Sequence, residues 1–177
     1  MKTSLSRRHL LQSGFGVAAA FAAAPALAVA ETRGLSFMNT HTGESLAVSY
    51  FRAGTYDPAG LEQVARVLRD HRTGDVHAID PGLLDLLHDL QVLADRDGAF
   101  QVISGYRSPQ TNGMLHSRSS GVATRSLHMD GKAIDIRLTG FPTKKLRDLA
   151  LSLKRGGVGY YAASDFVHVD TGRVRFW

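Results

Sequence analysis

The stretch SLHMDGKAIDIRL, residues 126–138, decides how the rest of this sequence is interpreted. Its second half, AIDIRL, alternates in the way typical of a β-strand, whose successive side chains point to opposite faces. Ile134 and Ile136 then share the face that packs into the core, and Asp135 lies on the other face of a rigid element. A carboxylate held there needs a partner, and a cation is the simplest one. His128 precedes the strand in a loop that can fold back towards Asp135.

The stretch DFVHVD, residues 165–170, supplies the other half of the expected site. As a strand it puts its two valines on one face and both His168 and Asp170 on the other. Two imidazoles and one carboxylate are a usual ligand set for a catalytic zinc ion, which keeps its fourth position open for water. The spacing therefore predicts a Zn²⁺ site in a metal-dependent hydrolase, with His128, Asp135 and His168 as ligands.

The N-terminal half of the chain predicts a hairpin and two helices. Apolar runs at 35–38 and 45–51, separated by polar residues, are typical of a β-hairpin. Asp57 and Asp80 are each followed by proline, and this pair of residues favours the start of a helix. Leucines at helical spacing follow the second start, and Gly98 is expected to end that helix.

The C-terminal half predicts short strands around a single helix. A polar loop of about twenty residues is expected to end near Arg125, and loops of this length inside a domain are often functional. Strands that cluster late with short connections favour a small antiparallel sheet with helices packed on one side, an α+β fold. The expected strands lie at 100–103, 133–138, 158–161, 166–169 and 174–177, and the helix lies at 142–154.

Residues 1–30 are typical of an export signal. A basic start is followed by an alanine-rich apolar run and a small-residue cleavage site that ends at Ala30. The paired Arg7 and Arg8 match a twin-arginine signal, although an ordinary secretory signal remains an alternative. We therefore expect the twin-arginine translocase as a partner and the periplasm as the location. The apolar run is short for a membrane span, and residues 31–177 are expected to form one domain.

Composition and net charge bear on which ligands the protein can bind. The whole chain carries a net charge of +5. Removing the three basic residues of the expected signal from the total of 21 leaves 18, against 16 acidic residues, so the net charge falls to +2. Such a small surplus argues against nucleic-acid binding and is compatible with a polyanionic cell wall. The chain has no cysteine, so histidine and carboxylate must hold any zinc ion.

Three motifs together resemble a known family. The pattern S-x-H-x-x-G-x-A-x-D at residues 126–135 resembles the signature of the zinc D-alanyl-D-alanine carboxypeptidase and dipeptidase family. The pattern D-x-x-H at 165–168 is similar to that family's acid-x-x-His, and SGYRS at 104–108 resembles its arginine motif. The resemblance is strongest to the exported YcbK-like branch, the murein endopeptidase K group, and it covers essentially the whole chain.

The resemblance implies the fold, the cofactor and the residue roles. The fold would be the small α+β fold of peptidoglycan metallopeptidases and the hedgehog signalling domain. His128, Asp135 and His168 would bind Zn²⁺, and Arg107 would face the carbonyl or carboxylate of the substrate. The expected substrate-binding residues are Arg107, Ser126 and Tyr106.

The identity of the catalytic base stays open between two aspartates. Relatives in this family use glutamate at the position of Asp165, which favours that residue, whereas strand alternation favours Asp170. The implied function is a zinc-dependent murein endopeptidase that hydrolyses peptide cross-links of peptidoglycan. A zinc D,D-carboxypeptidase and a non-catalytic peptidoglycan-binding or zinc-binding domain remain alternatives, and the sequence does not identify the bond that is cut.

Overall fold

The computed structural model describes residues 31–119 and 121–177, so the expected signal at 1–30 lies outside the described residues. The strands are β1 (Thr32–Asn39), β2 (Ser45–Arg52), β3 (Thr55–Tyr56), β4 (Phe100–Ser104), β5 (Ala133–Leu138), β6 (Gly157–Tyr161), β7 (Phe166–Asp170) and β8 (Arg175–Phe176). The α-helices are α1 (Pro58–Val67), α2 (Pro81–Ala94), α3 (Pro109–Arg118) and α4 (Thr143–Leu153), and two 3₁₀ turns are η1 (Leu127–Asp130) and η2 (Ala162–Ser164).

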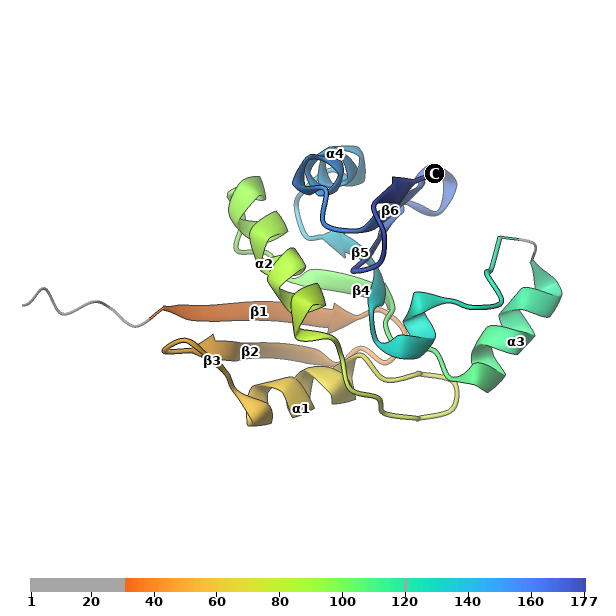
Figure 1. The fold of residues 1–177 in the computed structure, drawn as a ribbon, viewed down its shortest axis with the longest axis horizontal. Helices are drawn as coiled ribbons and strands as arrows, with labels where there is room; N and C mark the ends of the chain where they lie inside the picture. The colour runs from red at the N-terminus through yellow and green to blue at the C-terminus, as the bar shows by residue number, and fades with distance from the viewer. Residues whose placement is uncertain (1–30, 120) are drawn as a thin grey trace, which may run out of the picture.

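The strands of the described chain form one sheet in the order β3-β2-β1-β4-β5-β7-β6-β8 (Figure 1). Two pairs, β1 with β4 and β6 with β8, are parallel, and the other pairs are antiparallel. The α+β class is confirmed, but the sheet is mixed where a wholly antiparallel one was expected. The reason is the long connection through β2, α1 and α2, which returns the chain to β4 in the direction of β1.

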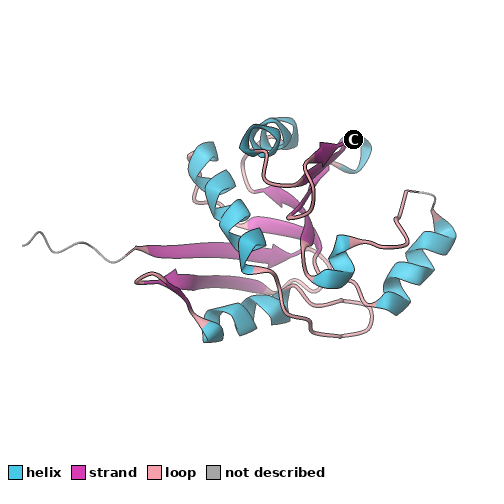
Figure 2. Cartoon of the chain, in the orientation of Figure 1, coloured by secondary structure: helices cyan, strands magenta, loops and turns pink. Residues whose placement is uncertain are grey.

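One hydrophobic core lies between the sheet and helices α1, α2 and α4 (Figure 2). Ile134 and Ile136 of β5 are completely buried in it, as the alternation predicts. Helix α2 contributes a stripe of leucines, among them Leu84, Leu87 and Leu90, which have no exposed surface. Each buried leucine is worth about 1.5–3 kcal/mol, so α2 is a main contributor to stability. None of the helices in the described chain combines the length and the apolar character that crossing a bilayer requires.

The predicted helix starts are confirmed, but one predicted end is wrong. The Asp57 carboxylate accepts the N–H of Ala59, and the Asp80 carboxylate accepts the N–H of Gly82. Helix α2 ends at Ala94, because Asp95 adopts the left-handed conformation there with φ 49°. Gly98, the expected end, lies further on in the loop.

Helix α3 was not predicted, because the roughly twenty residues that follow Gly105, to about Arg125, were expected to be a loop. Ser108 caps α3 by accepting the N–H of Thr111, and Pro109 occupies its first turn. The helix is polar and has no apolar stripe, so hydrophobic periodicity could not reveal it. It lies apart from the sheet and the other helices (Figure 1).

Candidate metal centre

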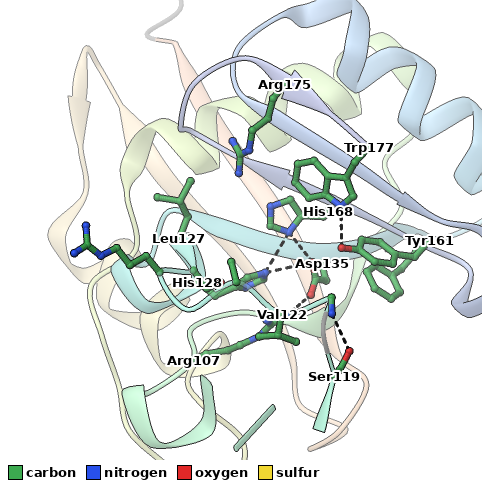
Figure 3. Close-up of a pocket in the computed structure, with 15 residues that line it drawn as sticks. Arg107, Ser119, Val122, Leu127, His128, Asp135, Tyr161, His168, Arg175 and Trp177 are labelled. Carbon is green, nitrogen blue, oxygen red and sulfur yellow. Dashed lines mark hydrogen bonds and ion pairs between the residues drawn. The ribbon is translucent and has the colours of Figure 1, made fainter. Parts of the chain in front are cut away.

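Three buried side chains converge at one point (Figure 3). His128 Nε2 lies 3.2 Å from His168 Nδ1 and 3.3 Å from Asp135 Oδ1, and the latter two atoms are 2.9 Å apart. A tetrahedral ion with bonds of about 2.0–2.1 Å would separate its ligand atoms by roughly 3.3 Å. The sequence-predicted ligands therefore already have the spacing that a small divalent cation requires.

Strand pairing explains why two of these residues meet. Asp135 of β5 and His168 of β7 are direct cross-strand partners, and such partners have Cβ atoms about 4.5–5.5 Å apart. His128 reaches them from η1, which ends at Gly131 with a left-handed φ of 64°. A Cβ atom at Gly131 would lie 2.1 Å from the carbonyl oxygen of Ala78. Only glycine fits this close turn, which directs the chain from His128 into β5.

Each histidine is oriented through the ring nitrogen that points away from the cluster. His128 Nδ1 lies 2.7 Å from the carbonyl oxygen of Gly105 and donates to it. His168 Nε2 lies 3.0 Å from Asp170 Oδ2 and donates to that carboxylate. These bonds place the ring hydrogens outside the cluster and leave the lone pairs of His128 Nε2 and His168 Nδ1 directed into it. Such outer partners are typical of metal-bound histidines.

The carboxylate of the cluster is held in its ionised form. Burial opposes charge on Asp135, but His128 and His168 outweigh it and hold its pKa well below the usual value. Burial lowers the pKa of His128. Burial has the same tendency at His168, but the nearby carboxylates of Asp135 and Asp170 favour its charged form and raise its pKa overall.

Asp170 contacts His168, and both of its carboxylate oxygens accept further hydrogen bonds. Its fully buried carboxylate accepts the N–H groups of Gly157 at 3.0 Å and Gly172 at 2.8 Å. Arg175 donates to both of its oxygens, at 3.1 and 2.7 Å. Burial would raise the pKa of Asp170, but His168, Arg175 and the two backbone groups hold it well below its usual value. Strand alternation correctly predicted that Asp170 shares a face with His168, but the carboxylate contacts the outer nitrogen of that ring.

Asp165 is not brought to the cluster. The residue adopts a left-handed conformation with φ 49° at the end of η2, and its side chain is 66% exposed. Its carboxylate accepts the hydroxyl of Thr143, at the start of α4, at 2.5 Å and lies 3.5 Å from Arg137 Nε. The turn thus directs Asp165 towards α4, outside the cavity that the three ligands line. The structure gives no geometric support to the expectation that this carboxylate is the base.

Residues 104–108 support the cluster from one side. Arg107 Nη2 donates to Asp135 Oδ2 at 2.6 Å, and its Nε donates to Ser104 Oγ at 2.8 Å. The bond occupies the carboxylate oxygen that faces away from the histidines and leaves Oδ1 for a cation. Tyr106 stacks on His77 with ring centroids 4.7 Å apart and does not line the cavity. Tyr106 is buried in the hydrophobic core, so its predicted contact with substrate gains no support from the structure.

The cluster lies in a cavity of about 430 Å³ that carries positive charge. Three arginines line it, and two of them are paired: Arg107 with Asp135, and Arg175 with Asp170. Arg125 has no ion-pair partner within the described part of the chain. The lining residues are Arg107, Ser119, Gly121, Val122, Ala123, Arg125, Ser126, Leu127, His128, Asp135, Tyr161, Phe166, His168, Arg175 and Trp177.

Several contributors were missed by sequence reasoning. Arg175 lies in β8 and Trp177 directly follows that strand, so strand alternation could have placed both side chains on the side of the cavity. Asn112 of α3 donates to the carbonyl oxygens of Ala123 and Thr124 at 3.1 and 3.2 Å. The unpredicted helix therefore holds the loop that forms one wall of the cavity. No sequence signal pointed to this role.

A buried carboxylate anchors the arginine loop. Asp70 is 1% exposed and accepts the backbone N–H and the hydroxyl of Ser108, at 2.9 and 2.7 Å, and the N–H of Arg72 at 2.9 Å. Burial would raise the pKa of Asp70, but hydrogen bonds from Thr111, Ser108 and the backbone hold it well below the usual value. Asp70 thereby fixes the residue that follows Arg107.

Replacing Asp70 with alanine is expected to lower the free energy of unfolding by about 2–4 kcal/mol, because three donors lose their charged acceptor. Urea unfolding measures this loss. The pKa in the folded state lies below the value of about 3.9 in the unfolded chain, so the stabilisation is present above that pH and is lost as the pH falls below it. The stability difference between wild type and Asp70→Asn should therefore shrink below about pH 4; a constant difference from pH 7 to pH 3 would contradict this.

Comparison with known proteins gives consistent matches. A family model described as "Peptidoglycan L,D-endopeptidase MepK", of the peptidase M15_2 group, matches residues 27–177. The chain is 42% identical over 180 residues to the peptidoglycan L,D-endopeptidase MepK of Escherichia coli K12, covering 99% of both chains. It is 46% identical over 144 residues to the probable peptidoglycan L,D-endopeptidase MepK of Haemophilus influenzae, covering 81% of this chain and 77% of the relative. No solved structure matches the chain.

Proposed function

The chain belongs to the MepK family of M15 peptidases, and on that premise we propose that it is a zinc-dependent endopeptidase that hydrolyses peptide cross-links of peptidoglycan. The relatives are named L,D-endopeptidases, so the proposed bond joins an L-configured centre to a D-configured one. The observation that carries the proposal is the cluster of His128, Asp135 and His168, whose ligand atoms lie 2.9–3.3 Å apart inside a cavity.

The residues present fit a zinc ion. His128 Nε2, Asp135 Oδ1 and His168 Nδ1 would hold it, and two nitrogens with one carboxylate oxygen are a donor set that zinc accepts in catalytic sites. When bound, zinc supplies Lewis acidity, which polarises a carbonyl group and lowers the pKa of water. The outer bonds to Gly105 and Asp170 keep both imidazoles in the required orientation.

The other cavity residues prepare the site for an anionic peptide. Arg107 orients Asp135 by donating to its Oδ2, and Arg175 keeps Asp170 ionised and oriented. Asp170 in turn keeps a proton on Nε2 of His168. Arg125 adds a positive charge that no described carboxylate neutralises, which suits the free carboxylates of peptidoglycan peptides.

A non-catalytic zinc-binding domain of the cell wall is the second candidate. The observation in its favour is that neither Asp165 nor Asp170 presents a free carboxylate to the cavity. The similarity to endopeptidases along the whole length of the chain favours catalysis. A D,D-carboxypeptidase gains no such support from the names of the relatives.

The proposed function also has a consequence for the compartment in which the protein acts. Peptidoglycan lies outside the cytoplasmic membrane, so the proposed substrate requires export. We therefore propose that residues 1–30 direct the chain to the periplasm through the twin-arginine pathway, with Arg7 and Arg8 as the paired arginines of the signal.

Digestion of purified peptidoglycan fragments tests the proposal. The protein is incubated with cross-linked muropeptides that contain either L,D or D,D cross-links, and the products are identified by mass spectrometry. We expect cleavage of the L,D cross-link, its loss after complete removal of metal by a chelator, and its recovery when zinc is added back. Cleavage that survives metal removal would refute the metallopeptidase mechanism. Release of terminal D-alanine alone would favour the carboxypeptidase, and zinc binding without any cleavage would favour the binding domain.

A further inference from the structure

The indole ring of Trp177 is held beside the cluster of His128, Asp135 and His168. It packs against the backbone of Gly159, where a Cβ atom would lie only 2.6 Å from the indole. Gly159 is the cross-strand partner of His168, and the indole centroid lies 5.2 Å from that imidazole. The Arg175 guanidinium stands over the indole at 5.1 Å. A glycine and two cavity residues therefore hold Trp177 in one place.

Trp177 in turn orients the hydroxyl group of Tyr161. The indole nitrogen donates to Tyr161 Oη at 2.9 Å, and an indole N–H can only donate. The phenol oxygen is the acceptor, so its own O–H remains available as a donor. No acceptor for that O–H is present within the described part of the chain. Stacking on Phe166, with centroids 4.5 Å apart, fixes the plane of the Tyr161 ring.

The hydroxyl group of Tyr161 faces the site of the expected chemistry. Tyr161 lines the same cavity as the three ligands, and Figure 3 shows its hydroxyl turned towards His168 and Asp135. The guanidinium groups of Arg107 and Arg175, which line the same cavity, are already bound to carboxylates. The phenol is thus an uncommitted, uncharged donor directed at the cluster.

We propose that Tyr161 is a catalytic residue that donates a hydrogen bond to the oxygen of the scissile carbonyl, and that Trp177 is the positioning residue that aims it. The inference rests on the proposed function. In peptide hydrolysis, water adds to the carbonyl carbon, the C–N bond breaks, and the protons of water end on the new carboxyl group and the amine. Negative charge develops on the carbonyl oxygen before the bond breaks. A preorganised donor lowers the energy of that state more than it lowers the energy of the bound substrate.

Tyr161→Phe removes only the hydroxyl and keeps the stack on Phe166. We expect kcat for muropeptide hydrolysis to fall about a hundredfold while KM changes little, as for loss of one oxyanion donor. Tyr160→Phe is the matched control, because Tyr160 precedes Tyr161 in β6 and lies on its other face, with the Arg147 guanidinium over its ring at 4.9 Å. It should retain wild-type kcat, and both variants should retain wild-type metal content.

A second substitution separates positioning from catalysis. Trp177→Phe keeps an aromatic ring and removes the donor to Tyr161, so we expect kcat to fall about tenfold. The double variant Tyr161→Phe/Trp177→Phe should have the same kcat as Tyr161→Phe alone. The indole acts through the phenol, so the losses in kcat from the two substitutions are not additive. Additive losses in the double variant would overturn the positioning role of Trp177.

Binding gives a measurement independent of turnover. Trp177 is the only tryptophan in the chain, so its fluorescence reports directly on the cavity. A phosphinic peptide, which carries a tetrahedral anionic group in place of the scissile carbonyl, is titrated against the wild type, Tyr161→Phe and Tyr160→Phe, all of which keep Trp177. We expect Tyr161→Phe to weaken its binding by about the same factor as kcat, and Tyr160→Phe to leave it unchanged.

Two results distinguish failure of the role of Tyr161 from failure of the proposed function. An active wild-type enzyme whose Tyr161→Phe variant keeps both kcat and phosphinic-peptide affinity would overturn the role of Tyr161 alone. A metal-loaded wild-type protein that neither cleaves muropeptides nor binds the phosphinic peptide would overturn the proposed function, and the role of Tyr161 with it.

Discussion

Replacing His128 with alanine is expected to abolish metal binding and hydrolysis together. His128 is almost fully buried and contributes one of three ligand atoms, and no other described side chain is placed to substitute for it. Loss of an outer partner typically costs ten- to a hundredfold in metal affinity, and loss of a direct ligand should cost more. Metal content after dialysis and the rate of muropeptide cleavage measure the two effects.

A matched histidine variant controls for this result. His88 lies on α2, has a partly exposed ring and lines no part of the metal cavity. His88→Ala should keep wild-type metal content and activity. Full metal occupancy and turnover in His128→Ala would show that the three-residue cluster is not the metal site.

Replacing Asp170 with alanine should both destabilise the fold and weaken metal binding. The fully buried carboxylate is shared by His168, Arg175 and two backbone N–H groups. Its removal leaves two backbone N–H groups and the partly exposed Arg175 without their acceptor, so we expect the free energy of unfolding to fall by about 2–4 kcal/mol. His168 also loses the bond that orients it, so we expect metal affinity to fall about ten- to a hundredfold. Urea unfolding and metal titration measure these two losses separately.

Asp165→Ala serves as the comparison for Asp170→Ala, because it removes the other aspartate that was considered as the catalytic base. Its carboxylate is two-thirds exposed and bound to Thr143 at the start of α4. Removing it should change stability by less than about 1 kcal/mol, as is usual for exposed pairs, and should leave metal content and turnover near wild type. Loss of turnover in Asp165→Ala with the metal still bound would show that this carboxylate reaches the cluster during catalysis, as the family resemblance implies.

The parts of the fold that follow from local rules could be predicted. The pairs Asp57–Pro58 and Asp80–Pro81 begin helices because aspartate satisfies free N–H groups and proline needs none. Ile134 and Ile136 identified the buried face of β5 because strand side chains alternate. Helix α3 was not predicted, because its sequence lacks the apolar periodicity that indicated the other helices.

Residue types and spacing by themselves determined the candidate ligands, since two histidines and a carboxylate, His128, Asp135 and His168, lie within or shortly before two strands of a chain without cysteine. Their outer partners were decided by the tertiary structure alone. The backbone of Gly105, the guanidinium group of Arg175 and the indole of Trp177 come from separate segments that only pairing and packing bring together. Alternation gives the face on which Asp170 lies, but which nitrogen of His168 it contacts depends on the two backbone N–H groups and the arginine that hold it. A sequence pattern records the direction of a side chain along its own strand, whereas the direction of a hydrogen bond is fixed by neighbours distant in the chain.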